Sequence, residues 1–354
     1  MRSKTLYPHT VTDGTFILSQ PLRLDKWANE KCRAKTFPTQ IDNGLKTCYH
    51  AYDFFRMEGC AMRKYTASVI AAGCLWGLMG LFTRTLAACG VDATGAIVLR
   101  CGIAALLFGA TILVRDPKQF RIRLRDFWCF FGTGICSLLF FTYCYFQAIT
   151  IMDLSTAAVL LYTAPSIVMV LSLLLFHERI AAQKLLALVL AFAGCCLVSL
   201  VGGEHKLSAA GILYGLGAGF GYALYSIFAR YALDRGYSSS TVNFYSCLLT
   251  AAGAAILWGA AQPLGVMFAS WQGFGLCTAL GIVTCYLPYL LYTYGLSGLE
   301  TGKASILASF EPVVATLVGI FVFHETLTPL SALGCVCVLS AVVLLNLKRR
   351  QKAN

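Results

Sequence analysis

The sequence GKASILASFEPVVATLVGIFVF, residues 302–323, decides how the rest of the chain is interpreted. About 20 mostly apolar residues are enough to cross the ~30 Å hydrocarbon core of a bilayer as one α-helix. The single acid of this stretch, Glu311, stands near its middle, directly before Pro312. The stretch therefore predicts a membrane-spanning helix with one carboxyl group at about half its depth.

The same arrangement of residues occurs once more, earlier in the chain. Pro165 precedes a Phe-His-Glu sequence by the same spacing as Pro312 does, and the two copies lie 147 residues apart. Self-similarity at a fixed offset indicates an internal duplication. The two copies differ most in chemistry at one position, because Glu311 in the second copy corresponds to Ala164 in the first.

The composition places the chain in the membrane class. Of its 354 residues, 58% are hydrophobic and only 12% are charged, about half the charged share of soluble domains. The 16 cysteines form no CxxC pair, and none is spaced with histidines as in a zinc site. We therefore expect an all-helical, polytopic membrane protein without a metal site or a cofactor.

Ten apolar segments of spanning length follow residue 65. They form two sets of five, which gives a first repeat at 62–203 and a second at 204–354 that ends in a basic tail. Residues 1–61 are polar and are interpreted as disordered, or as a spurious extension of a chain that starts at Met62. The ten segments are residues 66–88, 94–114, 126–148, 154–176, 183–202, 208–232, 240–261, 272–296, 302–323 and 328–347.

Basic residues lie mainly in alternate loops, and this bias predicts the orientation of the chain. Residues 115–125, after the second segment, and the C-terminal tail are both rich in Lys and Arg, whereas the opposite set of loops contains only Lys206. Because cytoplasmic loops are enriched in Lys and Arg, we expect both termini in the cytoplasm of a cell-membrane protein. The net charge of +12 is then spread over one membrane face, which argues against nucleic acid as a partner.

Each repeat has an odd number of helices, so the two repeats are predicted to cross the membrane in opposite directions. Inverted repeats of this kind place a substrate site between the halves, near the middle of the membrane. The beginnings of the repeats also match, as GCLWGLMGLFTR at 73–84 and GFGYALYSIFAR at 219–230. This organisation is typical of secondary transporters.

The segments LLYTAPSIVMVLSLLLFHERI at 160–180 and ILASFEPVVATLVGIFVFHETLTP at 306–329 resemble the EamA-type transporters of the drug/metabolite transporter superfamily. The resemblance extends over residues 66–347. It implies ten helices, a small organic metabolite as substrate, often export, and a cavity framed mainly by the first, third and fourth helices of each repeat. The chain departs from the family pattern at Cys101 and at the histidines before Glu178 and Glu325.

Glu311 is the first candidate site residue. A charge at this depth costs roughly 2.5–3.5 kcal/mol on insertion scales, so such residues usually face a cavity or a partner. The alternative is a protonated acid that hydrogen-bonds to a neighbouring helix for packing. Pro165 and Pro312 each remove one backbone hydrogen bond; they either form a hinge that shapes the cavity or are simply tolerated.

Three more charged residues have predicted roles. Glu178 and Glu325 stand just before a helix and are expected to be structural, because a carboxylate there faces the positive helix end. Arg100 is expected to extend along the membrane to its surface. Binding of a substrate carboxylate is the alternative role for Arg100.

Trp76, Tyr143 and Tyr289 are candidates for the wall of a pocket. They lie deep within their segments and offer stacking faces and hydroxyl groups, although aromatic stripes also serve helix packing. Glycines in the first and sixth segments, Gly77 and Gly219 among them, follow the spacing that lets membrane helices pack closely.

These features predict secondary transport of a small organic metabolite, such as an amino acid, by alternating access, with Glu311 serving ion coupling or amine recognition. The sequence lacks the GxxxxGK[ST] pattern of nucleotide binding. We expect the lipid bilayer and a small-molecule substrate as partners. Coupling is expected to an ion gradient, with a proton or another ion as partner, or to the gradient of the solute itself, and a homodimer is left open. The alternative class is a polytopic intramembrane enzyme acting on lipid or peptide. A passive pore is disfavoured because no ring of charges lines a helix face.

Overall fold

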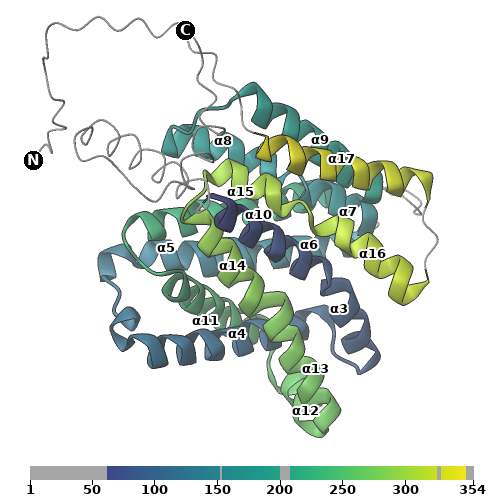
Figure 1. Ribbon diagram of the computed structural model, residues 1–354. Helices are drawn as coiled ribbons and strands as arrows, with labels where there is room; N and C mark the ends of the chain where they lie inside the picture. The colour runs from purple at the N-terminus through teal and green to yellow at the C-terminus, as the bar shows by residue number, and fades with distance from the viewer. Residues whose placement is uncertain (1–61, 152–153, 200–207, 325–327, 348–354) are drawn as a thin grey trace, which may run out of the picture. The chain divides into compact units, whose positions relative to one another are not determined.

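The computed structural model describes residues 62–151, 154–199, 208–324 and 328–347 (Figure 1). Every regular element within these ranges is a helix, and none is a strand. The predicted all-helical class is therefore confirmed. The interpretation of residues 1–61 and the role of Glu325 concern parts of the chain outside the described residues.

Nine helical stretches within the described part are long and apolar enough to cross a membrane. The fifth predicted segment, 183–202, corresponds to α9 (Ala182–Ser199), whose apolar part, Ala182–Val198, is shorter than the others. The nine stretches are Met62–Ala88, Ala93–Arg115, Leu124–Ile151, Thr156–Phe176, Ala209–Asp234, Ser239–Trp258, Trp271–Leu296, Thr301–Phe323 and Pro329–Asn346.

Several of these stretches are divided by turns or by π-helical segments. The short helix α12 (Ala261–Ala269) lies in a connection that was predicted to be a loop. After the helix at 62–77, and apart from two 3-10 turns at Pro117–Phe120 and Leu124–Asp126, the elements in chain order are α3 (Met79–Ala88), α4 (Ala93–Arg115), α5 (Phe127–Phe131), a π-helix (Gly132–Leu139), α6 (Phe140–Ile151), α7 (Leu154–Leu161), α8 (Ala164–Phe176), α9, α10 (Ala209–Asp234), α11 (Ser239–Trp258), α12 (Ala261–Ala269), α13 (Trp271–Gly281), a second π-helix (Ile282–Tyr286), α14 (Leu287–Leu296), α15 (Thr301–Ala308), α16 (Glu311–Phe323) and α17 (Pro329–Asn346).

The stretch at 302–323 is not one continuous helix, contrary to the prediction. α15 ends before a turn at Ser309 and Phe310, and α16 starts at Glu311. α7 and α8 are divided in the same way, at the same offset of 147 residues. Proline lacks the N–H that a helix interior needs, but it fits the first turn of a helix. Pro165 and Pro312 both lie in such a first turn.

The two halves also agree in finer detail. α8 ends at His177 and α16 at His324, and both histidines are left-handed, with φ of 53° and 55°. Glycine is the usual residue for this helix-ending conformation, which accounts for the small residues that the family resemblance implies there. The third span of each half contains a π-helix that ends directly before α6 or α14. Because π-helical turns are rare and often occur at functional sites, their recurrence indicates a candidate functional region at this level of the bundle.

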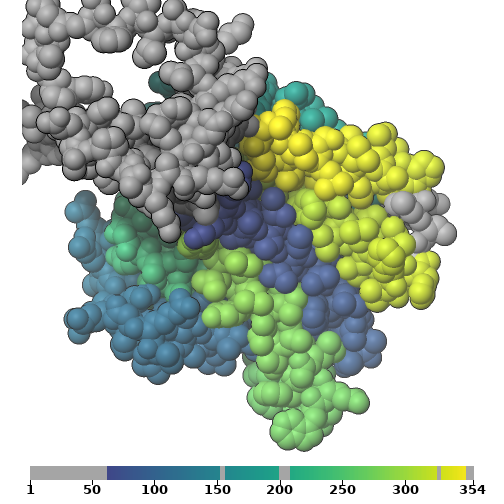
Figure 2. Space-filling view, viewed as in Figure 1, coloured from purple at the N-terminus to yellow at the C-terminus, as the bar shows by residue number. Residues whose placement is uncertain are grey.

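Equivalent helices of the two halves pack against each other. α9 packs along α17, beside which it lies in Figure 1, and α4 packs along α11. The α9–α17 contact is tight, because a Cβ on Gly194 would lie 2.6 Å from the carbonyl oxygen of Gly334. The first span lies directly beside α15 and α16 in the space-filling view (Figure 2). The core is thus built between the halves.

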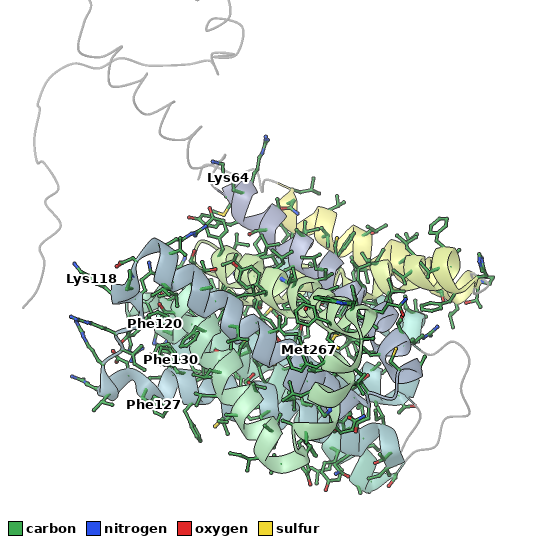
Figure 3. All side chains as sticks on the ribbon, turned by 90° about the horizontal axis from the view of Figure 1, so that it is seen from below. Lys64, Lys118, Phe120, Phe127, Phe130 and Met267 are labelled. Atoms are coloured by element: carbon green, nitrogen blue, oxygen red, sulfur yellow. The ribbon has the colours of Figure 1, made fainter. Side chains whose placement is uncertain are left out.

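Large apolar side chains cover the outward faces of the helices. Val114 and Ile256 are 84% and 83% exposed. On α5, Phe127 is partly exposed, whereas Phe130 on the same helix is fully buried (both are labelled in Figure 3). Soluble monomers rarely expose contiguous apolar surface, whereas lipid chains can cover such faces, so the surface agrees with the membrane class.

Candidate functional site

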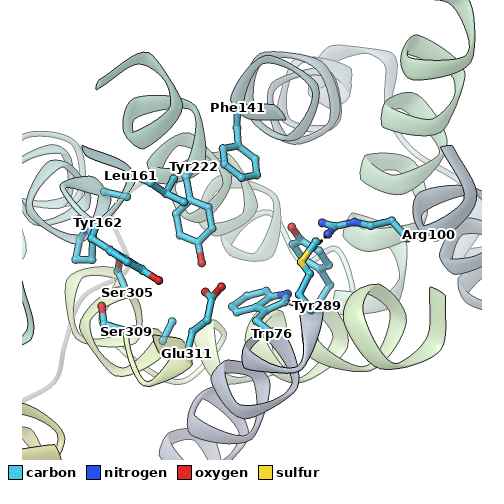
Figure 4. Close-up of a pocket in the computed structure, with 14 residues that line it drawn as sticks. Trp76, Arg100, Phe141, Leu161, Tyr162, Tyr222, Tyr289, Ser305, Ser309 and Glu311 are labelled. Atoms are coloured by element: carbon cyan, nitrogen blue, oxygen red, sulfur yellow. Dashed lines mark hydrogen bonds between the residues drawn. The ribbon is translucent and has the colours of Figure 1, made fainter. Parts of the chain in front are cut away.

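A cavity of about 70 Å³ lies where the two broken spans meet. The α7–α8 break contributes Tyr162 and Pro165 to its wall, and the α15–α16 break contributes Ser309 and Glu311 (Figure 4). The other walls come from the first span, α4, α6, α10 and α14. One water molecule needs roughly 10–15 Å³ of such space, so the cavity has room for several waters or for part of a small solute.

Two glycines bring the first helix of each half onto the break of the other half. A Cβ at Gly77 would lie 2.6 Å from the Cβ of Val314 and 2.7 Å from the carbonyl oxygen of Glu311. A Cβ at Gly219 would lie 2.9 Å from the carbonyl oxygen of Leu160. Because only a residue without a Cβ permits these approaches, the predicted packing role of both glycines is confirmed.

Glu311 occupies the first position of α16, where the positive end of the helix favours a carboxylate. Its half-buried side chain faces the cavity and points toward Tyr222 in Figure 4. It makes no hydrogen bond and no ion pair within the described part of the chain. The alternative of an acid bonded to a neighbouring helix for packing therefore finds no support in this geometry.

Arg100 was expected to extend to the membrane surface, but the structure places its side chain in the interior. Its side chain on α4 is only 7% exposed and lines the same cavity as Glu311. The Nη1 group donates a hydrogen bond to the sulfur of Met79 at 3.1 Å, and Nε has no partner among the described residues. The physical reason is the rotation of α4, which places Arg100 against Met79 of the first span and Tyr289 of α14.

Aromatic rings form much of the cavity wall. The Trp76 ring lies 5.3 Å from the Tyr289 ring and 6.5 Å from the Tyr222 ring, measured between centroids. Trp76 and Tyr289 therefore lie where they were predicted. Tyr143 does not: it is 41% exposed and contacts Tyr214 instead. Two residues earlier on α6, Phe141 faces the cavity, and a helix turns about 200° over two residues, so Tyr143 must point away.

A buried polar network holds Tyr289 in place. Asn243 on α11 donates from Nδ2 to the carbonyl oxygen of Tyr289 at 3.0 Å. The Oδ1 atom of Asn243 accepts hydrogen bonds from the Tyr225 hydroxyl at 2.5 Å and from the Thr293 hydroxyl at 3.1 Å. Because every member of such a network is satisfied internally, it stiffens the helices around the cavity. This network was not predicted from the sequence.

Several cavity residues were also not predicted from the sequence, including Tyr162, Tyr222, Ser305 and Ser309. Tyr162 and Ser309 occupy equivalent positions in the two halves, at the turns that precede the two prolines. Their place beside the repeated proline was the signal that could have identified them. Of the two prolines, Pro165 lines the cavity, whereas Pro312 is buried and is not part of its wall.

Glu178 faces the start of a helix, as predicted, but the helix belongs to the other half. Its carboxylate accepts hydrogen bonds from the backbone N–H groups of Thr301 at 2.7 Å and Gly302 at 3.2 Å. These groups open α15 and have no partner inside the helix. The structural role expected for Glu178 is thus a connection between the halves.

Comparisons with known proteins agree with this architecture. The EamA-like transporter family matches the chain twice, over residues 64–200 and 209–347. An uncharacterised transporter of Archaeoglobus fulgidus is 30% identical over 283 residues, which cover 80% of this chain and 96% of that protein. The threonine/homoserine exporter RhtA of Escherichia coli K12 is 29% identical over 274 residues, which cover 74% of this chain and 85% of that protein. A solved crystal structure at 20% identity has the same fold, with a TM-score of 0.67 over 80% of this chain and 96% of its own.

One family matched twice accounts for the repeated proline sequence and for the paired helix breaks. The family and the two relatives above are named as transporters and not as enzymes, and the apolar spans and the cavity between the halves suit the movement of small molecules across a membrane. The chain therefore belongs to the EamA-like transporter family of the drug/metabolite transporter superfamily, as a multi-pass membrane protein that is not an enzyme.

Proposed function

We propose that the chain is a secondary transporter that exports a small organic metabolite of the amino-acid class across the cell membrane by alternating access. The observation that carries this proposal is the cavity between the two helix breaks, which one carboxyl group, that of Glu311, faces without a partner among the described residues. The name of one relative, a threonine/homoserine exporter, supports both the class of substrate and the direction.

We further propose ten spans in two inverted five-helix repeats, at 62–203 and 204–354. The exchange of contacts supports this arrangement, because the first helix of each half packs on the broken fourth helix of the other. The two breaks then serve as equivalent hinges at the same depth. Movement of one half against the other would open the cavity to one membrane face at a time.

Both termini are proposed to lie in the cytoplasm. Lys64 and Lys118 stand at helix ends in Figure 3, on the face that the distribution of basic residues assigns to the cytoplasm. On that same face, Glu178 binds the start of α15, and Lys184 forms an ion pair with Glu300. These contacts join the two halves, which supports a state that is closed toward the cytoplasm.

Glu311 is proposed to couple transport to an ion gradient, with a proton as the expected ion. In its ionised form the carboxylate can pair with the ammonium group of a substrate, and in its protonated form it cannot. Proton and substrate would then exchange at one site, which links the movement of one to that of the other. The tyrosine hydroxyls of Tyr162 and Tyr222 border the same space and can hydrogen-bond to either form.

The experiment compares the full-length protein with Glu311→Gln in reconstituted vesicles under an imposed pH gradient. Glutamine keeps the size and hydrogen-bonding capacity of the side chain, so we expect normal insertion but loss of gradient-driven amino-acid transport. Asp234→Asn, an exposed acid on α10 whose ion pair with Arg230 stays within one helix, is the matched control and should behave like the unchanged protein. Transport by Glu311→Gln at the original rate and with the original pH dependence would refute the role assigned to Glu311.

A further inference from the structure

The guanidinium group of Arg100 lacks the acceptors that a buried cation needs. It carries five N–H donors in a planar fork, yet its hydrogen-bond partner is the sulfur of Met79, the thiol of Cys101 lies beside it, and Nε has no partner among the described residues. Sulfur is a weak acceptor. A buried charge without adequate partners is costly, so this geometry points to an acceptor that arrives from the cavity.

The same cavity carries its opposite charge at another place. Glu311 and Arg100 are the two formally charged side chains among the residues that line it. They form no ion pair with each other among the described contacts. One cavity therefore presents a negative site and a positive site.

We propose that Arg100 forms a carboxylate-binding subsite and that the transported solute is a zwitterion, with its ammonium group at Glu311 and its carboxylate at Arg100. This inference rests on the proposed transport function and specifies the substrate as a free amino acid. The guanidinium fork matches a carboxylate in a bidentate geometry. The faces of Trp76 and Tyr222 suit an ammonium group beside Glu311.

The two charges also select against related solutes. An amine without a carboxylate would leave Arg100 with only sulfur acceptors, and an organic acid without an amine would place a second anion in the cavity with Glu311. A site built to bind a polar group rejects analogues that lack it, because its own buried groups then stay unpaired. We therefore expect amino acids to be preferred over both their decarboxylated amines and their deaminated acids.

The test uses the full-length protein in lipid vesicles with three labelled pools: the standard L-amino acids, the amines formed by their decarboxylation, and the matching carboxylic acids without the amino group. We expect uptake from the first pool only, relative to protein-free vesicles. Equal or faster uptake from the second or third pool would overturn the zwitterion site but leave the transporter assignment standing. Absence of uptake from all three pools would overturn both.

Variants of Arg100 test the subsite itself. Arg100→Gln should raise the KM for the transported amino acid about 10- to 100-fold, the range for loss of a charge-assisted hydrogen bond. It should also raise the uptake of the corresponding decarboxylated amine relative to the uptake of the amino acid. Arg100→Lys keeps the charge without the fork and should restore part of the preference. Arg115→Gln, on the exposed end of the same helix, is the control. An Arg100→Gln protein that keeps the original preference among folded molecules would overturn the proposal, since a folding defect alone changes yield and not selectivity.

Discussion

Replacing Glu178 by alanine removes the acceptor of two backbone N–H groups at the start of α15. In the structure, these groups belong to Thr301 and Gly302, both of which are buried. A buried donor left without a partner costs roughly 1–3 kcal/mol, and loss of a negative charge at a helix N-terminus adds about 0.3–1 kcal/mol. Because Glu178 itself is only partly buried, water can reach the donors. We therefore expect Glu178→Ala to lower the free energy of unfolding by about 2 kcal/mol.

The size of the effect should depend on which atoms are kept. Glu178→Gln retains one carbonyl oxygen, so it can accept one of the two hydrogen bonds, and its loss should be about half that of alanine. Glu300→Gln is the control on the same helix start. The Glu300 side chain makes no capping hydrogen bond and is 50% exposed in its ion pair with Lys184, and exposed ion pairs contribute about 0–1 kcal/mol.

The assay is thermal denaturation of the detergent-solubilised, full-length protein, followed by the folded fraction that remains after heating. The expected order of stability is unchanged protein and Glu300→Gln first, then Glu178→Gln, then Glu178→Ala. If Glu178→Ala were as stable as the unchanged protein, the two hydrogen bonds to α15 would not hold the halves together. If Glu300→Gln were the least stable of the set, the ion pair and not the helix cap would make the connection.

Two further predictions follow from the packing and from the orientation. Gly77→Ala should lower stability by about 1–3 kcal/mol, because the new Cβ would lie 2.7 Å from the backbone oxygen of Glu311. Gly80→Ala on the same span meets nothing within 4 Å and should be neutral or slightly stabilising in the same thermal assay; equal effects at both positions would contradict the close approach. The orientation predicts that a cysteine placed at the exposed Gln262 reacts with an impermeant external reagent, while a reporter at the C-terminus lies in the cytoplasm. The experiment uses a Cys89→Ser background, because the native Cys89 thiol is exposed as well. A labelled C-terminus with an unreactive Gln262→Cys would contradict the orientation and with it the inverted arrangement.

The spans and the repeat could be predicted because both depend on local sequence. Apolar length determines which segments cross the membrane, and the repeated proline fixes where each fourth span is divided. The exact place of the break was missed, since the apolar run at 302–323 continues across the turn at Ser309 and Phe310. The proline could have indicated it, because a helix accepts proline most readily in its first turn.

The cavity was predicted only in part, because its walls depend on how each helix is rotated against its neighbours. Glu311, Trp76 and Tyr289 face it as expected, whereas Tyr143 and Phe141 lie on the same helix and differ only in the direction in which they point. The place of Arg100 along the second span follows from the sequence, but that place does not distinguish the outward face of α4 from the face that lines the cavity. The two π-helical segments were not predicted either: the apolar runs at 126–148 and 272–296 were interpreted as regular spanning helices.

Shared and unshared features of the two halves have different physical roles. The prolines, the left-handed histidines and the helix bounds recur, and Ala164 occupies the equivalent of Glu311 within an identical break, so the fold needs no acid there. The first half supplies Arg100, whereas α11, the equivalent helix of the second half, carries no Lys or Arg. A zwitterion bound to both charges would therefore connect one half to the other. A ligand shifts a conformational equilibrium only by its differential affinity for the two states, and a solute that must contact both halves has that property, because any movement that separates Arg100 from Glu311 changes how well it is bound.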